Sequence, residues 1–262
     1  MHAIARLGEM VWAQADEVRH AAALIGAVVW AGVQPRHWAR TVRRALARQI
    51  HAIGVEPLLF VCGLAVFVGI AVVVQLAFWT GATGQSQLLG PLLVSVVARE
   101  LGPVLINIVV IVRSGSVMAT ELGIMKIDGR IQAIEAQGIS PFTSLVMPRV
   151  VAAAVSTLCL TVVFIVVAFG SGYLFGAWLG KGSRDIWFFT DTVIHAIQPN
   201  DAVGILAKCI LPALFTSASC CIHGLGVGGA VTDIPETTQR ALTRSVGGLF
   251  VISAVVSVLT YL

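Results

Sequence analysis

The chain has 262 residues, of which 57% are hydrophobic and only 11% are charged, and its formal net charge is +4. Soluble domains carry about 25% charged residues, so this composition excludes an ordinary soluble domain and predicts an all-α integral membrane protein. We expect no nucleic-acid partner. The five cysteines lie in apolar runs without CxxC spacing. They are typical of small packing residues, although Cys220 and His223 form one isolated C-x-x-H pair.

Residues 1–53 form the most charged part of the chain, which we interpret as a cytosolic and interfacial N-terminal region. Its apolar run Ala21–Val33 is too short to span a membrane and is either interfacial or re-entrant. Acidic residues ahead of it disfavour a cleaved signal peptide. Pro35–Ile53 alternates arginines with apolar residues at helical spacing, which favours an amphipathic helix in the headgroup layer over a solvated basic helix.

Five apolar segments follow, separated by polar turns. We predict that each crosses the membrane: Leu58–Phe78, Leu88–Val112, Val150–Gly180, Ala202–His223 and Val246–Leu262. Pro103 can kink the second segment. The third is longer than one crossing needs and carries Gly172, Gly176 and Gly180, whose spacing allows another helix to approach closely or arises by chance. The fifth is barely long enough.

Basic residues are distributed asymmetrically about these segments. With a cytoplasmic N-terminus, twelve lysines and arginines lie on the inner side and two, Lys181 and Arg184, on the outer side. The positive-inside rule therefore predicts a cytoplasmic N-terminus and a C-terminus outside.

Charged and polar side chains interrupt the second and fourth segments. Glu100, Asn107 and Ser114 recur every seven residues and share one helix face, while Arg99 points elsewhere. An ionised group inside a bilayer usually faces a cavity or a partner. We interpret the stripe as the lining of a substrate path with Lys208 as a counter-charge; the alternative is a polar contact that fixes helix packing.

Between the second and third segments, isoleucines at helical spacing predict a short amphipathic helix over Glu121–Glu135. Gly138 is placed to end it, and Ser140-Pro141 to begin the next helix. Such a helix either docks on another protein or rests on lipid.

No motif for nucleotide hydrolysis is present. The pattern G-x-x-x-x-G-K-[ST] is absent, and the G-x-G-x-x-G at Gly224–Gly229 lacks the strand–helix setting that gives it meaning. We read the latter as a loop. The chain is therefore not expected to be an enzyme or to hold a cofactor.

Four motifs occur in order between Ser95 and Ala154: ARELGPVL, RSGS followed by ATELGIMK, IQAIEAQGISP and LVMPRVVA. Together they resemble the signature of the MlaE-type permeases, membrane subunits of ABC transporters that move phospholipids or other lipids between bacterial membranes. The resemblance implies an interfacial helix, a five-span permease domain over 54–262 and a homodimer around a lipid cavity. It also implies a cytosolic ATPase that binds the ATP, a periplasmic ring of MCE-domain proteins and, in some systems, a small STAS-domain protein.

The resemblance assigns roles to particular residues. Glu100 matches an acidic residue of the second span and Lys208 a basic residue of the fourth, both associated with the lipid cavity. With Arg99 and Asn107, these form the expected lipid path. The expected ATPase-coupling residues are Glu121, Met125, Lys126, Arg130 and Glu135.

The sequence thus predicts an ATP-driven lipid permease of the inner membrane of a diderm bacterium; plastid lipid importers share the signature. Some relatives carry an acid in the last span, which Val246–Leu262 lacks. An ion-coupled secondary transporter and a non-transporting membrane anchor remain as alternatives, although no internal repeat supports the former.

Overall fold

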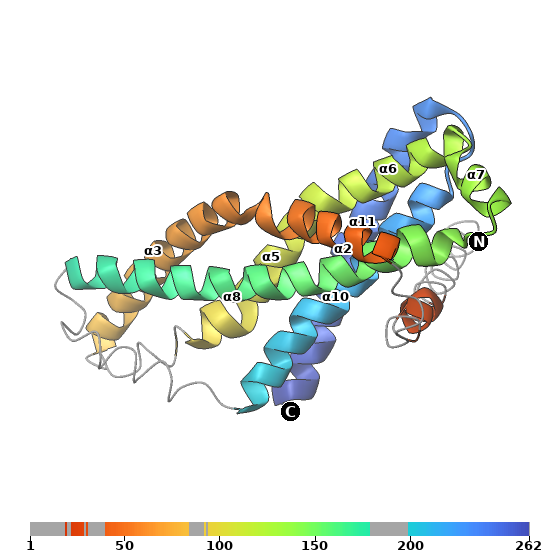
Figure 1. Ribbon diagram of the computed structural model, residues 1–262. Helices are drawn as coiled ribbons and strands as arrows, with labels where there is room; N and C mark the ends of the chain where they lie inside the picture. The colour runs from red at the N-terminus through yellow and green to blue at the C-terminus, as the bar shows by residue number, and fades with distance from the viewer. Residues whose placement is uncertain are drawn as a thin grey trace, which may run out of the picture.

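The computed structural model describes residues 19, 22–28, 30, 40–83, 92, 94–178 and 199–261, and within these ranges it is helical with no strand (Figure 1). Five helices are long and apolar enough to cross a membrane: Arg40–Leu76, Val94–Ile127, Phe142–Trp178, Asp201–Leu225 and Val231–Thr260. The prediction of an all-α membrane protein with five spans is confirmed.

The amphipathic helix leads directly into the first span. Helix α2 (Arg40–Ile50) exposes its arginines and buries Val42, and a π-helical turn η2 (His51–Val55) joins it to α3 (Leu58–Thr83) across Glu56-Pro57. The helical backbone thus continues past the boundary predicted between residues 53 and 54, and that division stays a prediction. The predicted helix start, 35–39, lies outside the described residues.

The second span is longer than predicted. It runs through η4 (Val94–Leu101), α5 (Gly102–Val110), η5 (Ile111–Gly115) and α6 (Ser116–Ile127) without a break. The helix continues past Val112, where the predicted apolar segment ends, and it includes Gly115 and Gly123 before it ends ahead of Gly129, whose φ is positive. Pro103 has no N–H for the helical ladder, and the π-helical η4 ends two residues before it, at Leu101.

The single helix predicted over Glu121–Glu135 is two elements. Helix α6 ends at Ile127, and a short α7 (Arg130–Ala136) follows. Gly129 lies between them with φ of +71°, a left-handed conformation that glycine adopts without a steric penalty and that a helix interior does not contain. The isoleucine stripe therefore spans a turn.

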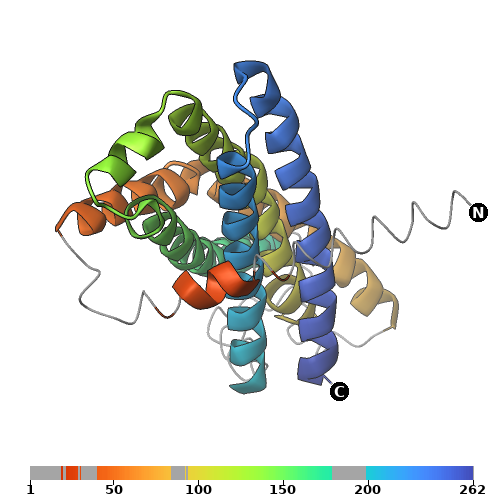
Figure 2. The same ribbon diagram turned by 90° about the vertical axis from the view of Figure 1, so that its right-hand side faces the viewer.

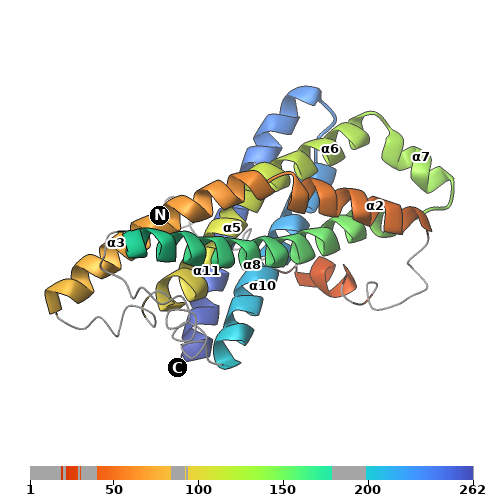
Figure 3. The same cartoon turned by 60° about the vertical axis from the view of Figure 1, so that its left-hand side comes forward.

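The third span packs closely along the first. After η6 (Phe142–Val146), α8 (Met147–Trp178) lies beside α3, as Figure 3 shows. A Cβ at Gly172 would come 2.6 Å from Val73 Cγ2, and one at Gly69 would meet the Ala168 carbonyl. The predicted close approach at Gly172 is thus confirmed, and its partner is α3 of the same chain. Gly180 lies outside the described residues.

The last two spans form an antiparallel pair, α10 (Pro199–Leu225) and α11 (Ile234–Tyr261), visible in Figure 2. The predicted loop at Gly224–Gly229 is confirmed at 226–230, and a 3-10 turn η7 (Val231–Asp233) follows. The polar composition of Thr232–Gln239 favours a turn, but residues 234–239 are the start of α11. Pro235 and Glu236 suit the first turn of a helix, where a proline loses no hydrogen bond and an acid faces the positive end of the dipole.

The last turns of α6, α7, the start of α8 and the loop between α10 and α11 lie at one end of the bundle (Figure 1), and these segments carry Lys126, Arg130 and Arg149. We call this end of the bundle the coupling end. Helical residues 22–28 lie there, with Val28 buried in one cluster with Leu122, Met147 and Val150. Residues 1–18, 20, 21, 29 and 31–39, residues 84–87 of the predicted turn after Phe78, and the loop carrying Lys181, Arg184, Asp185 and Asp191 lie outside the described residues.

Candidate functional site

A buried ion pair joins the second span to the fourth. Lys208 Nζ, on α10, lies 2.6 Å from Glu100 Oε1 and also donates to the Arg99 carbonyl over 3.0 Å. The Lys208 side chain is 0% exposed, whereas that of Glu100 is 46% exposed. The predicted counter-charge is therefore in place, and the carboxylate is the half of the pair that reaches the surface.

Two further contacts tie this pair into the bundle. Arg99 Nη2 lies 2.7 Å from Asp201 Oδ2, whose side chain is 2% exposed in the first turn of α10. Ser257 of α11 donates its hydroxyl to Glu100 Oε1 over 3.2 Å. Arg99 and Glu100 are adjacent in η4, so the two ion pairs join η4 to α10 at two points. The hydrogen bond from Ser257 joins α11 to the same site.

Asn107 lies inside the helix contact. It is 1% exposed and donates from Nδ2 to the Pro103 carbonyl over 2.8 Å and to the Lys208 carbonyl over 3.1 Å. Ser114 is 7% exposed and lines a different surface. Of the predicted stripe, only Glu100 presents a large polar surface in this chain. A role for these residues in a lipid path stays a prediction.

The electrostatics explain why these charges persist in apolar surroundings. Each buried ion costs several kcal/mol to desolvate, and a partner at hydrogen-bond distance offsets that cost. The arrangement places a carboxylate at an apolar surface, with Lys208 paired to it from the interior side. Such a carboxylate can bind a cationic or hydrogen-bond-donating group.

At the coupling end, two of the predicted coupling residues make contacts within the chain. Glu121 accepts a hydrogen bond from Arg149 over 2.8 Å, and Lys126 Nζ donates to the Leu225 carbonyl over 2.6 Å at the C-terminus of α10. Arg130 pairs with Asp128 over 3.3 Å at the surface. Glu135 is exposed and Met125 half-buried. No residue of α7 is buried.

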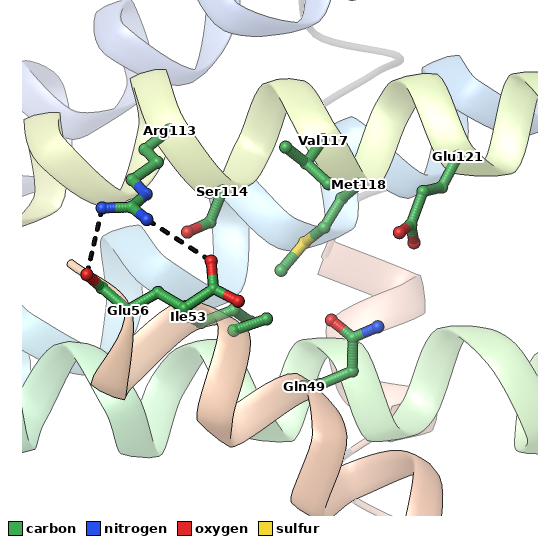
Figure 4. A pocket seen from close by; sticks show the side chains of 9 residues that line it. Gln49, Ile53, Glu56, Arg113, Ser114, Val117, Met118 and Glu121 are labelled. Atoms are coloured by element: carbon green, nitrogen blue, oxygen red, sulfur yellow. Dashed lines mark hydrogen bonds and ion pairs between the residues drawn. The ribbon is translucent and has the colours of Figure 1, made fainter.

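Three residues of the site were not predicted from the sequence. Arg149 and Asp201 complete buried ion pairs, and Glu56 pairs with Arg113 beside a surface cleft between η2 and α6 (Figure 4). Each is a charge next to an apolar segment, which is the signal that could have drawn attention to it. Their partners, however, lie between 28 and 102 positions away in the sequence.

The histidine of the fourth span is hydrogen-bonded, and the cysteines of this span are packed in the interior. His223 bonds the Ser219 carbonyl through Nδ1 and Arg244 through Nε2. Cys209, Cys220 and Cys221 are buried and unbridged, as small packing residues are. Among the described residues, no cluster of histidine, cysteine and carboxylate side chains is arranged to hold a metal.

Comparison with known proteins gives a consistent result. The family model "Permease MlaE" matches residues 46–259. A chloroplast protein of Arabidopsis thaliana, TRIGALACTOSYLDIACYLGLYCEROL 1, is 28% identical over 84% of this chain and 61% of its own length. A probable ABC transporter permease of Synechocystis is 27% identical over 81% of this chain and 80% of its own length.

An intermembrane phospholipid transport system permease protein, MlaE of Haemophilus influenzae, is 30% identical over 54% of this chain and 55% of its own length. This chain thus spans less than two thirds of the Arabidopsis and Haemophilus proteins but most of the Synechocystis one. Because the family model covers the chain from the second half of α2 through the five spans to residue 259, the chain belongs to the MlaE permease family.

Proposed function

We propose that this chain is the membrane subunit of an ATP-driven transporter of phospholipids or related lipids. The observation that carries the proposal is the ion pair in which a fully buried Lys208 supports a half-exposed Glu100 within the membrane spans. An ionised carboxylate at an apolar surface is a polar contact for a headgroup beside walls that accept acyl chains. The Haemophilus relative is named for phospholipid transport and the Arabidopsis relative for a galactolipid.

ATP hydrolysis in this proposal belongs to a separate cytosolic ATPase that docks on the coupling end. Helix α7 supports this because none of its residues is buried and, among the described residues, its main packing contact is with α6. A seven-residue helix has little stability by itself, and Ile131 and Ile134 give it an apolar surface for a groove. A docked partner would supply the missing contacts.

The assembly follows the family resemblance. We propose a homodimer in the inner membrane of a diderm bacterium, with the N-terminus cytoplasmic and the C-terminus periplasmic. A periplasmic MCE-domain ring and a small STAS-domain protein are the further proposed partners. The positive-inside count supports the orientation, because the basic residues of the coupling end lie on its proposed cytoplasmic side.

The test is co-expression with the ATPase encoded nearest in the genome, followed by native mass spectrometry and reconstitution into liposomes. We expect two permeases, two ATPases and bound phospholipid, with lipid transfer that depends on ATP. Glu100→Gln should reduce the transfer, whereas Glu236→Gln, at an exposed ion pair on α11, should not. Unchanged transfer in Glu100→Gln would contradict the role of the carboxylate.

The half-exposed Glu100 also favours one second candidate, an ion-coupled transporter in which this carboxylate takes up a proton. The same liposomes distinguish the two functions. Transfer driven by a proton gradient without ATP would support the second candidate, and transfer driven by ATP without a gradient supports the first.

A further inference from the structure

A surface cleft lies between the amphipathic helix and the second span, away from the Glu100–Lys208 pair. Its volume is about 90 Å³, and its polar lining consists of Gln49, Glu56, Arg113, Ser114 and Glu121 (Figure 4). A water occupies about 30 Å³ of liquid volume, so the cleft has room for a small polar group but not for an acyl chain.

The distribution of charged residues along the spans indicates the depth at which the cleft lies in the membrane. Glu56 is the last charged residue before the charge-free helix α3, and Arg113 is the first after the charge-free run Leu101–Val112. Both therefore mark the point where a charge-free helix segment ends. Membrane helices place that point at the boundary between hydrocarbon and headgroups. The cleft lies at the depth of lipid headgroups.

The ion pair that borders the cleft is loose. Arg113 reaches the Glu56 carbonyl at 3.3 Å and its carboxylate at 3.4 Å, and the two side chains are 44% and 52% exposed. An exposed ion pair of this kind contributes at most about 1 kcal/mol. The guanidinium has five N–H donors and the carboxylate about four acceptor sites, so each can take a further partner. A ligand carrying both a phosphate and an ammonium could replace the pair.

Apolar side chains continue from the cleft toward the hydrocarbon side. Leu59 and Phe60, just after Glu56, are 86% and 60% exposed, and Val112, just before Arg113, is 59% exposed. These three side chains offer a surface for acyl chains whose headgroup occupies the cleft. The combination matches a lipid and not a soluble anion.

We propose that this cleft binds the headgroup of a zwitterionic phospholipid that carries a primary amine. Arg113 and the Ser114 hydroxyl bind the phosphate, and Glu56 binds the ammonium. None of the nine lining residues is aromatic, so the cleft lacks the cage that recognises a quaternary ammonium. The inference rests on the proposed function in taking a lipid as the ligand, and it names the headgroup class.

The experiment measures binding to the purified full-length chain in detergent by calorimetry. The probes are short-chain phosphatidylethanolamine, phosphatidylcholine and phosphatidylglycerol, with inorganic phosphate as the soluble source of the same anion. We expect phosphatidylethanolamine to bind at least tenfold more tightly than the other two lipids, and phosphate to bind weakly. Arg113→Gln should weaken binding of all three lipids about tenfold, which corresponds to about 1.4 kcal/mol.

Glu56→Gln should remove the preference for phosphatidylethanolamine and leave phosphatidylglycerol binding unchanged or stronger, since a negative charge is removed. Arg240→Gln, at an exposed ion pair outside the cleft, is the matched control and should change no affinity. Thermal unfolding of each variant verifies folding. Any of three results would overturn the proposal: the three lipids bind equally tightly, phosphate binds as tightly as the lipids, or Arg113→Gln and Glu56→Gln do not change binding.

ATP-driven lipid transfer by the complex separates this inference from the proposed function. Transfer that proceeds while the two cleft variants bind headgroups normally would overturn the cleft and leave the transporter intact. Headgroup binding that depends on Arg113 and Glu56 in a complex without ATP-driven transfer would support the cleft and contradict the transporter.

Discussion

Arg149, at the start of α8, donates from Nη2 to Glu121 Oε2 of α6 over 2.8 Å, and this one ion pair joins the second span to the third at the coupling end. The Arg149 side chain is only 4% exposed. Its Nε and Nη1 are buried without a hydrogen-bond partner among the described residues. The buried guanidinium therefore depends on Glu121 for its compensation.

Glu121→Gln should destabilise the folded chain by about 1–3 kcal/mol, because it leaves the Arg149 charge without an anionic partner. Thermal unfolding in detergent measures the change. Glu135→Gln on the exposed α7 is the matched control and should change stability by less than about 0.5 kcal/mol. Glu135→Gln should instead weaken ATPase binding. If Glu121→Gln weakened ATPase binding at unchanged stability, Glu121 would be a docking residue and not a positioning one.

Glu100→Gln should destabilise the chain by about 2–4 kcal/mol, because the buried Lys208 ammonium then loses the carboxylate that lies 2.6 Å from it. The double variant Glu100→Gln/Lys208→Met should recover part of this loss, since it removes the charge that needs a partner. Unfolding in a series of detergent mixtures compares the two. A double variant less stable than Glu100→Gln would show that the hydrogen bond from Lys208 to the Arg99 carbonyl outweighs its ion pair.

Gly69→Ala should destabilise the packing of α3 on α8 by about 1–3 kcal/mol, because its Cβ would collide with the Ala168 carbonyl and a backbone cannot move aside cheaply. Gly63→Ala is the control on the same helix, since its Cβ would meet nothing within 4 Å. That change should be neutral or slightly stabilising, as alanine favours helices. Melting temperatures of the two variants test the difference; equal values would contradict the close contact.

Gly129→Ala should strain the turn between α6 and α7 by about 1 kcal/mol, because alanine is disfavoured at φ of +71°. Gly129→Asn should be tolerated better, since asparagine visits the left-handed region more readily. If α7 is the docking helix, ATPase affinity should fall in Gly129→Ala and be largely retained in Gly129→Asn. Pull-down of the ATPase with each variant measures this affinity. Equal amounts of ATPase retained by the two variants would show that the conformation of the turn does not affect docking.

Helices marked by a continuous apolar run or by helical spacing of apolar residues could be predicted from the sequence. Helix boundaries that depend on a single residue could not. Apolar runs located all five spans, and the apolar spacing of Val42 and Leu46 located α2. The second span continued past Arg113 because a helix tolerates a charge that reaches the surface or a partner. The coupling helix was split by Gly129, whose conformation depends on the turn it occupies.

The candidate site was predictable in part for the same reason. Glu100 and Lys208 stood out because a charge in an apolar run is costly, so a sequence alone indicates that each needs a partner. The sequence also predicted that Asn107 lines the substrate path, but its side chain lies in the contact between α5 and α10. The pairs Arg99–Asp201 and Arg149–Glu121 could not be derived, because no periodicity relates residues on different helices.

The sequence by itself determined the membrane class, the five spans, the amphipathic helix and the charges that need compensation, because hydrophobicity and helical period are local properties of the chain. The tertiary structure alone decided which charges meet, which glycines allow α3 and α8 to touch, and that Arg113 and Glu56 border a cleft. These depend on the rotation and depth of each helix against its neighbours, which are fixed by packing of the whole bundle and not by any one segment.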